Sequence, residues 1–527
     1  MDTRSFNTGT RLHPVSGTGR AAVQGSAATR QIEQQAASTL PHHTLMSRAG
    51  LAVARLARAL QPHARCIWVA CGPGNNGGDG LVAATHLHQW AQERSGFPEV
   101  VVTHAVRDET RMPADARQAL RAARAACVPF SDGPPARFDV AIDALFGIGP
   151  QRALEGSLAP WLDLLRSCAQ PVLCVDVPSG LDADTGVLAA LNAPSLAPPG
   201  PRHTLSLLTL KPGLFTGTGR DAAGSVWFDD LDVPPATAVP VTAWLAGQPQ
   251  TTGTRPHASH KGSFGDVLVL GGQGIAVQGA GMTGAAVLAA RAALHAGAGR
   301  VFVGLLEGDA SRPTPWDPAC PELMFRRPQR LLEPGILEAA SVVCGCGGGA
   351  SVAALLPRVL SAARTLVLDA DALNAIATDT ALQTLLGHRR GRGWTTVLTP
   401  HPLEAARLLG TTTPEVMAHR LKAAQALADR FGALCVLKGS GSVLASPGEV
   451  PLINASGNAA LATAGTGDVL AGMIGSAIAP AGLSGEGVRD RVAAAVHQHG
   501  WLADHWDDGA APGLTAGRLA ARVRPPG

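Results

Sequence analysis

Asn458-Ala-Ala-Leu-Ala-Thr-Ala-Gly-Thr-Gly-Asp-Val-Leu-Ala-Gly472 is the stretch that most constrains the fold and chemistry of this chain. It holds a turn of small residues at 464–467, then Asp468, then an apolar run over 469–478 with the composition of a helix. Glycines at a helix start let backbone N–H groups approach an anion, and the helix dipole adds about half a positive charge there. A carboxylate beside such a site can take a proton from a hydroxyl group that receives a phosphoryl group. The stretch predicts either such a site, with Asp468 as the base, or an ordinary glycine-rich helix start.

The composition is that of a globular protein with two domains. The 527 residues suffice for two α/β domains of about 250 residues each. Hydrophobic residues make up 46% and charged residues 16%, so disorder does not dominate. The chain has 43 basic and 40 acidic residues and a net charge of +3, which predicts neither nucleic-acid nor membrane partners. Aromatic residues are only 4% and Tyr is absent, which disfavours a base-stacking surface.

Cysteine usage and the chain ends indicate the compartment. Nine cysteines occur without a CxxC pair, which favours buried thiols in a reducing compartment over a zinc site or a disulfide framework. Residues 1–26 are polar and lack a signal-peptide core, and the longest late apolar run is broken by Pro480. We therefore expect a cytoplasmic protein without a membrane span, with residues 1–28 disordered or frayed.

The first half contains a nucleotide-type βα unit. Helical periodicity begins near Thr29 and resumes over 45–57, where Gly50 and Ala54 predict close packing against a sheet. A buried strand at 66–70 runs into Gly72-Pro-Gly-Asn-Asn-Gly-Gly-Asp-Gly80, and a helix is expected over 81–92. The two Asn and the Asp of this loop can hydrogen-bond a polar ligand, in addition to backbone donors for a phosphate.

Two further strands of the first half end in acids. Strands at 138–143 and 172–176 end at Asp143 and Asp176, and Ser179 follows the second. In a parallel doubly wound sheet the carboxyl ends of the strands share one edge, so these residues are expected to converge with Asn76. Hard oxygen ligands of this kind suit an alkali or alkaline-earth ion.

These motifs resemble those of NAD(P)H-hydrate epimerase. The resemblance rests on the loop at 72–80, on Asp143-Ala-Leu-Phe-Gly-Ile-Gly149, on Asp176-Val-Pro-Ser-Gly-Leu-Asp182 and on Thr209-Leu-Lys-Pro-Gly213, and it covers about residues 29–235. One departure is Ser47 after Met46, where the family usually has Glu.

The resemblance implies a role for each matched residue. Those implied to hold the hydrated nucleotide are Asn75, Asn76, Gly77, Gly78, Asp79, Gly147, Ile148, Gly149, Pro150, Gln151, Arg152, Ala153 and Asp176. Asn76, Asp143 and Ser179 would bind a potassium ion, and Asp176 would act as acid and base. One carboxyl group suffices to interconvert the two epimers, because the hydroxyl must be protonated, lost from the ring and returned on the other face. The fold also occurs in non-catalytic binding modules, which would not need the loop acids.

The second half predicts another α/β domain. Periodicity is lost over 231–255, so a linker is expected at 246–254 between domains at 29–245 and 255–527. Strands are expected at 266–270, 300–305, 341–344, 366–368, 396–398 and 435–437, alternating with helices that include a largely buried one at 282–296. The predicted fold class is α/β, with an N-terminal Rossmann-like doubly wound sheet and a second mostly parallel sheet covered on both faces.

The end of this second half resembles a second family. Lys438 follows a strand and precedes Gly439-Ser-Gly-Ser442, a layout in which the lysine can pair with a nucleotide phosphate. With the turn before Asp468, it resembles the ribokinase-like fold, and in particular the ADP-dependent NAD(P)H-hydrate dehydratases. The match rests on His260-Lys-Gly-Ser-Phe-Gly265, Leu398-Thr-Pro-His-Pro402, Leu437-Lys-Gly439 and residues 457–468, and it covers about residues 255–522.

This second resemblance implies two sets of ligand contacts. Lys438, Gly439, Ser440, Gly441, Ser442 and Gly467 would contact the adenine nucleotide, and Ala286, Gly347, His401 and Asp468 the hydrated nicotinamide nucleotide. Asp468 would be catalytic, moving the terminal phosphoryl group of ADP to the ring hydroxyl so that phosphate leaves, with magnesium neutralising the phosphates. Cys344-Gly-Cys-Gly-Gly-Gly349 departs from the family's Gly-Pro-Gly-Leu-Gly, and losing the proline is expected to loosen this turn.

Alternatives remain open from the residues alone. His401 fits a buried structural histidine as well as a substrate contact, and His497 and His499 are expected at the surface without a metal role. The second domain could instead be an ATP-dependent kinase of a vitamin precursor or sugar, joined to a non-catalytic binding module. The resemblances together favour NADH hydrate, NADPH hydrate and ADP as ligands, in a homo-oligomer that is a tetramer or larger.

Overall fold

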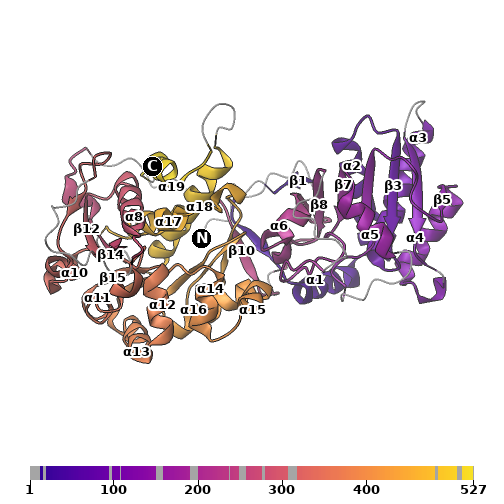
Figure 1. Cartoon of the computed structure of the whole chain (residues 1–527). Coiled ribbons are helices and arrows are strands. Elements are labelled where there is room, and N and C mark those ends of the chain that lie inside the picture. The colour runs from indigo at the N-terminus through magenta and orange to yellow at the C-terminus, as the bar shows by residue number, and fades with distance from the viewer. Residues whose placement is uncertain are drawn as a thin grey trace. The chain divides into compact units, whose positions relative to one another are not determined.

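The computed structural model describes residues 12–15, 19–93, 98–106, 108–149, 158–189, 200–236, 238–248, 257–275, 279–306, 317–480, 485–506 and 513–525. Their contacts divide the chain into two compact units, of residues 1–16 and 22–243 and of residues 17–21 and 244–527. Each unit has its own sheet and its own hydrophobic clusters (Figure 1).

The first unit is built on an eight-stranded sheet with the order β1-β9-β8-β7-β6-β3-β4-β5. Neighbouring strands are parallel except for β1 and β9. The chain runs from β3 outward to β5, returns to β6 and continues the other way to β9, so the order reverses between β3 and β6. The strands are β1 (His13–Pro14), β3 (Cys66–Cys71), β4 (Glu99–His104), β5 (Phe130–Ser131), β6 (Val140–Ala144), β7 (Val172–Val175), β8 (Arg202–Leu207) and β9 (Ser225–Asp229).

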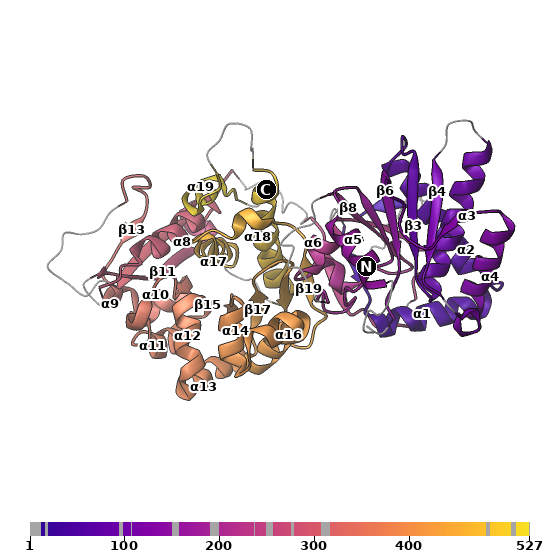
Figure 2. The same ribbon diagram turned by 45° about the vertical axis from the view of Figure 1, so that its right-hand side comes forward.

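Helices cover both faces of this sheet (Figure 2). In β3, Ile67 and Val69 pack with α2, α3 and α4, whereas Trp68 and Ala70 pack with α5, as the alternation of side chains along a strand requires. The helices are α1 (Ser26–Thr39), α2 (Thr44–Leu60), α3 (Asn75–Glu93), α4 (Ala114–Ala125), α5 (Leu158–Ser167) and α6 (Gly219–Ala223). The Rossmann-like doubly wound sheet predicted from the sequence is confirmed.

Three local expectations differ from the structure of the first unit. The segment before residue 29 was expected to be frayed, but it contributes β1, β2 (Ala21–Val23) and the start of α1. Gly50 packs against Val82 of helix α3 rather than against the sheet. Residues 75–80 of the glycine-rich loop are helical, because α3 begins at Asn75 and not at residue 81. Short polar strands and glycine-rich helix starts give little periodic signal, which explains these differences.

The second unit contains an eleven-stranded sheet with the order β13-β12-β11-β14-β15-β16-β17-β18-β19-β10-β2. Strands from β13 to β17 are parallel, and β18 is antiparallel to both of its neighbours. The strand order reverses between β11 and β14. The strands are β10 (Ala243–Ala246), β11 (Asp266–Gln273), β12 (Arg300–Leu306), β13 (Met324–Phe325), β14 (Ser341–Cys344), β15 (Thr365–Leu368), β16 (Thr395–Leu398), β17 (Leu434–Leu437), β18 (Ser442–Ala445) and β19 (Leu452–Asn454).

Two hydrophobic clusters lie on opposite faces of this sheet. One joins the sheet to α8, α17, α18 and α19, and the other joins it to α11, α12, α13, α14 and α16. The helices are α8 (Thr283–His295), α9 (Pro328–Leu331), α10 (Pro334–Ala339), α11 (Leu356–Ala362), α12 (Ala370–Thr378), α13 (Thr380–His388), α14 (Pro402–Leu409), α15 (Thr413–Ala418), α16 (Arg420–Phe431), α17 (Thr466–Ala477), α18 (Glu486–Asp504) and α19 (Ala516–Arg522). The predicted α/β architecture of the second half is confirmed, and α8 is buried along most of its length as expected.

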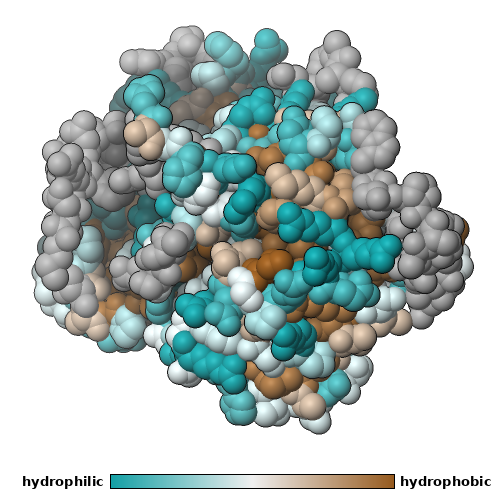
Figure 3. Space-filling model, turned by 90° about the vertical axis from the view of Figure 1, so that its left-hand side faces the viewer, coloured by the Kyte–Doolittle hydropathy of each residue, from teal (hydrophilic) through white to brown (hydrophobic). Residues whose placement is uncertain are grey.

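The boundary between the units precedes the expected linker. Strand β10 pairs with β19 of the second sheet, so the second unit begins at Trp244, and residues 249–254 of the expected linker lie outside the described part. No helix of the described residues is long and apolar enough to cross a bilayer. On the face shown in Figure 3, hydrophobic residues lie among hydrophilic ones.

Candidate active sites

The loops at the switch point of the first sheet are in close contact. Gly72, after β3, donates its backbone N–H to the carbonyl of Ala144 at 3.0 Å, and a side chain at Gly72 would collide with the Leu145 carbonyl. A Cβ added to Gly77, in the first turn of α3, would lie 1.9 Å from the Gly72 carbonyl oxygen. Only glycine allows these approaches, and they place the start of α3 beside the loop that follows β6.

A cavity of about 960 Å³ opens at this switch point. Several of the residues expected to hold a ligand line this cavity: Asn75, Asn76, Asp79, Gly147, Ile148, Gly149 and Asp176. Gly77 and Gly78 are buried within the first turn of α3, where the absence of a side chain allows close packing. Pro150, Gln151, Arg152 and Ala153 lie outside the described residues. The structure thus brings together residues 75–79, residues 147–149 and Asp176, which are far apart in the chain, as a site for a nucleotide-sized molecule.

Asp176 is held in the cavity by a lysine to which the sequence had assigned no role. The buried Lys211 donates from its Nζ to Asp176 Oδ1 and, at 2.7 Å, to the Leu207 carbonyl. The backbone N–H of Leu207 donates to the same oxygen of Asp176 at 3.1 Å. Asp176 adopts a left-handed backbone conformation with φ of 66°, which is uncommon for a residue other than glycine. Lys211 lies in the Thr209–Gly213 motif, so this motif was the feature of the sequence that could have pointed to the lysine.

Two further acids lie around Asp176, of which Asp79 was predicted from the sequence as a ligand contact and Glu33 was missed. Glu33 of α1 and Asp79 of α3 line the same cavity. Burial, and then the charge of Asp176, raise the pKa of Glu33 and raise that of Asp79 well above its ordinary value. The long sequence separation of Glu33 from the other acids left no pattern by which to find it.

Asp143 and Ser179 form a buried oxygen cluster next to this cavity. The Asp143 carboxylate accepts from the backbone N–H of Ser179 at 2.9 Å, from its Oγ at 2.6 Å and from the N–H of Leu145 at 3.2 Å. Burial raises the pKa of Asp143 despite these bonds, and a cation bound beside the carboxylate would offset this effect. Asn76 is buried, and a Cβ added to Gly147 would lie 3.3 Å from its Oδ1. These oxygens fit an alkali cation, as expected for potassium.

The candidate site of the second unit lies at the start of α17. Gly465 caps this helix in a left-handed conformation with φ of 91°, and Asp468 lies in its first turn. A Cβ added to Gly467 would lie 3.3 Å from Lys438 Nζ, so the lysine lies against the helix start. The prediction that His499 lies at the surface was wrong. His499 is buried, and its Nε2 lies 2.9 Å from the Thr466 carbonyl. Burial lowers its pKa to about 4. His499 thus supports the turn that carries Asp468.

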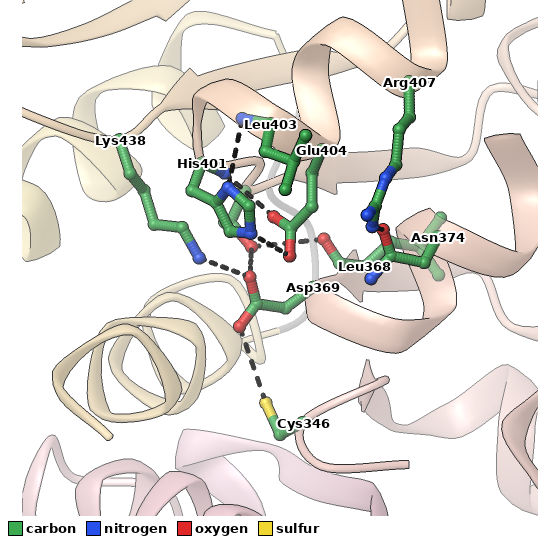
Figure 4. A network of polar contacts seen from close by, with 10 residues as sticks. Cys346, Leu368, Asp369, Asn374, His401, Leu403, Glu404, Arg407 and Lys438 are labelled. Carbon is green, nitrogen blue, oxygen red and sulfur yellow. Dashed lines mark hydrogen bonds and ion pairs between the residues drawn. The ribbon is translucent and has the colours of Figure 1, made fainter. Parts of the chain in front are cut away.

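Asp369 links Lys438 to the glycine turn after β14 (Figure 4). Its Oδ1 accepts from Lys438 Nζ at 2.7 Å and from Thr399 Oγ1 at 2.8 Å, and its Oδ2 lies 3.8 Å from Cys346 Sγ. Burial alone would lower the pKa of Lys438, but the carboxylates of Asp369 and Glu404 raise it overall. Asp369 directly follows the strand expected at 366–368, and the sequence assigned it no role.

Asp468 lies close to this group. Burial, and then the charge of Asp369, raise the pKa of Asp468 to about 6. The Cys346 sulfur and one carboxylate oxygen from each of Asp369 and Asp468 lie within 4.8 Å of one another. Mg²⁺ prefers oxygen ligands and retains water or phosphate oxygens, so a cluster with a thiol and an ion-paired carboxylate does not fit a dedicated Mg²⁺ site. Half-burial and the Lys438 ammonium suit Asp468 to a base that faces an anion.

The loop after Lys438 is held in place by the side chain of Arg420. The buried Arg420 guanidinium donates to the carbonyls of Leu437 at 3.3 Å, Lys438 at 3.2 Å and Gly441 at 3.2 Å. Gly439 and Ser440 are exposed, Gly441 is buried, and Ser442 is half-buried. The loop expected to contact an adenine nucleotide is thus fixed by its carbonyls, with Lys438 at its start.

Two of the expected contacts of a nicotinamide nucleotide, Ala286 and Gly347, lie at the start of α8. Ala286 is fully buried in α8, 3.0 Å from a Cβ added to Gly272, and a Cβ added to Gly347 would lie 2.8 Å from the Ala285 Cβ. His401 caps α14 through a capping box with Glu404, its side chain is 45% exposed, and it is therefore not a buried histidine. The turn expected to be loosened is held by bonds from Gly272 N–H to the Cys346 carbonyl at 2.9 Å and from Gln273 N–H to the Gly347 carbonyl at 2.6 Å.

The fold and the two sites define an α/β enzyme with two separate nucleotide-type sites, one at each switch point. A family model described as NAD(P)H-hydrate dehydratase matches residues 267–524, and one described as the YjeF-related protein N-terminus matches residues 42–213. The chain belongs to the family of bifunctional NAD(P)H-hydrate repair enzymes.

Three similar proteins illustrate the extent of the match. The bifunctional NAD(P)H-hydrate repair enzyme Nnr of Escherichia coli K12 is 35% identical over 470 residues, covering 85% of this chain and 83% of that protein. The ADP-dependent (S)-NAD(P)H-hydrate dehydratase of Neisseria meningitidis is 40% identical over 280 residues, covering 53% and 88%. A ribokinase-like superfamily protein of Enterococcus faecalis superimposes with a TM-score of 0.42 at 24% identity, covering 51% of this chain and 89% of that one.

Proposed function

We propose that this chain restores NADH and NADPH from their hydrates in two steps. The first unit equilibrates the R and S epimers of the hydrate, and the second dehydrates the S epimer with ADP, giving AMP and phosphate. The observation that carries the proposal is the position of Asp468, half-buried in the first turn of α17 beside Lys438. It supports a base that faces a phosphoryl group.

The dehydration follows from this geometry. Asp468 takes the proton of the ring hydroxyl, whose oxygen attacks the terminal phosphorus of ADP, and the bond from that phosphorus to AMP breaks. The ring nitrogen's lone pair then expels phosphate, and proton loss from the adjacent carbon leaves the dihydronicotinamide. Lys438, Gly439, Ser440, Gly441, Ser442 and Gly467 are proposed to hold ADP, and Ala286, Gly347 and His401 the hydrate. Magnesium bound to the ADP phosphates would neutralise part of their charge.

In the first unit, Asn75, Asn76, Gly77, Gly78, Asp79 and residues 147–153 are proposed to hold the hydrate near Asp176. Asn76, Asp143 and Ser179 would hold potassium, whose charge would offset the buried Asp143 carboxylate and orient the loop after β6. We further propose a homo-oligomer, a tetramer or larger, which light scattering of the purified protein tests.

The test uses the purified full chain and follows the absorbance band of reduced nicotinamide. We expect recovery of NADH from the S hydrate with ADP, and from the R hydrate only as fast as its epimer forms. Asp468→Asn is expected to lower kcat with the S hydrate by about 10²–10⁴-fold, as removal of a general base does. Without recovery, and with turnover of a vitamin alcohol with ATP, the second unit would be a kinase instead.

A further inference from the structure

The cavity of the first unit contains more acid than a single acid–base group requires. Glu33, Asp79, Asp115 and Asp176 all line it, together with Arg30 and Arg111. The side chains come from α1, α3, α4 and the end of β7, so the acids surround the space rather than share one loop. The neighbours of Asp79 and Asp176 differ in charge, and this difference separates their chemistry.

Asp176 faces a positive charge and is bonded through one oxygen. Lys211 and the backbone N–H of Leu207 both donate to Oδ1 of Asp176. No other hydrogen bond to this carboxylate occurs within the described ranges, so Oδ2 remains available to a ligand. An ion-paired carboxylate with one free oxygen is suited to accept a proton.

Asp79 has the opposite surroundings. The charged groups that act on it are Asp176, Glu33 and Asp115, all carboxylates, and burial is the larger effect on its pKa. The Cys71 thiol, from β3, also lies within the reach of its charge. Neither a cation nor a hydrogen-bond donor among the described side chains stabilises the ionised form. Asp79 therefore keeps its proton to higher pH than an ordinary aspartic acid.

Glu33 is a weaker candidate for the same role. The charges of Lys211 and Arg30 act on Glu33 and oppose the effects of burial and of Asp176. Arg30 also donates to the carbonyl of Ile148 at 2.7 Å, in the loop expected to hold the ligand. Among these acids, Asp79 is the one whose charged neighbours all favour protonation.

We propose that Asp79 and Asp176 divide the epimerase chemistry, with Asp79 as the proton donor and Asp176 as the base. The inference rests on the epimerase activity proposed above. Asp79 protonates the ring hydroxyl, the carbon–oxygen bond breaks with its electron pair leaving on water, and the nitrogen lone pair forms an iminium ion. Water then adds to the other face, its oxygen forming the new bond while Asp176 takes its proton. Return of that proton to Asp79 through cavity water restores the starting state.

The test measures exchange of the R and S hydrates by chromatography in the absence of ADP. Asp79→Asn is expected to lower kcat for exchange by about 10²–10⁴-fold with little change in KM, whereas Asp79→Glu recovers part of the rate. Wild-type exchange should decline at high pH as the donor loses its proton, and the residual activity of Asp79→Asn should lack that decline. Asp132→Asn, an exposed aspartate of the same unit, serves as the matched control and should exchange like wild type.

Folding and the proposed function are checked separately. Asp79→Asn removes a half-buried carboxyl group whose ionisation opposes folding, so its thermal unfolding at neutral pH should occur at or above the wild-type temperature. Lack of wild-type exchange in this assay would count against the epimerase activity itself. If wild type exchanges the epimers and Asp79→Asn changes only KM, or changes nothing, the division of roles is overturned while the epimerase activity stands.

Discussion

Asp468 and Asp176 are the same residue type with different charged neighbours. Asp176 is paired with Lys211, whereas Asp468 lies near the charge of Asp369, which is itself paired with Lys438. Burial, and then the charge of Asp369, raise the pKa of Asp468 to about 6, so this carboxyl group changes its protonation near physiological pH.

The pH dependence of dehydration should report Asp468. As a base it must be ionised, so kcat/KM for the S hydrate with ADP is expected to rise with pH through about 6 and then level off. Steady-state rates between pH 5 and 8 measure this, because below the pKa the value of kcat/KM should fall about tenfold for each pH unit. A profile that is flat across pH 6 in the wild type would contradict Asp468 as the titrating base.

Stability should change in the opposite direction. The pKa of Asp468 is higher in the folded chain than its ordinary value of 3.8, so ionisation above about pH 6 opposes folding. Asp468→Asn is therefore expected to stabilise the second unit by up to about 2–3 kcal/mol at pH 8, and the gain should vanish below about pH 4. Urea unfolding at both pH values measures the difference.

The sequence identified the side chains that belong to short motifs and missed those that arrive from elsewhere. Asp468, Asp176, Lys438 and the Asn75–Asp79 segment stand in glycine-rich motifs at strand ends, where topology alone implies a ligand. The roles of Lys211, Asp369 and Glu33 depend on contacts across many residues. Pairing and burial of that kind leave no periodic pattern, so only the folded chain reveals them.

At the scale of elements, the first turns of α3 carry the site of the first unit. Gly80 lies against Ala144 and Cys71, with an added Cβ 2.6 Å from the Ala144 Cβ, and Gly78 lies against Met46 of α2. Because glycine permits these contacts, α3 can approach both the sheet and α2 closely. The position of Asn76 and Asp79 therefore depends on packing along the whole helix start.

Gly50→Ala should disturb this packing. The added methyl group would collide with Val82 and approach the Asp79 carbonyl to 2.9 Å, so we expect destabilisation by about 1–3 kcal/mol and a loss of epimer exchange. Helix propensity alone would favour Ala by about 1 kcal/mol. Gly387→Ala, in α13 with open space around it, is the control and should be neutral or stabilising. Unfolding and epimer-exchange assays compare them, and equal stability of both variants would contradict the packing argument.

At the scale of the molecule, each unit is built on its own sheet and has its own candidate site. Buried strands alternating with helices predicted both sheets correctly, because parallel α/β packing leaves long apolar runs. The segments that the sequence misplaced are short: β1, β2 and β10 are two to four residues long. Their place in a sheet depends on neighbours distant in the chain, which a local pattern cannot report.

Separate sites should allow two damaged proteins to complement each other. We expect Asp176→Asn to dehydrate the S hydrate but not to exchange epimers, and Asp468→Asn to do the reverse. Since the hydrates are small and diffuse freely, a mixture of the two variants should recover NADH from the R hydrate. Absorbance recovery by each variant and by the mixture measures this. A mixture as inactive as either variant, at concentrations where wild type is active, would indicate that epimers do not pass between molecules.

The left-handed backbone of Asp176 also limits how this position can be altered. Asparagine adopts such a conformation readily because its short polar side chain bonds nearby backbone groups, whereas alanine and glutamate do so at a cost of about 1 kcal/mol or more. Of the simple replacements, asparagine removes the charge and leaves the main chain where it is. Lost activity in an alanine or glutamate variant would combine missing chemistry with a relaxed loop, and it would overstate what the carboxylate itself contributes.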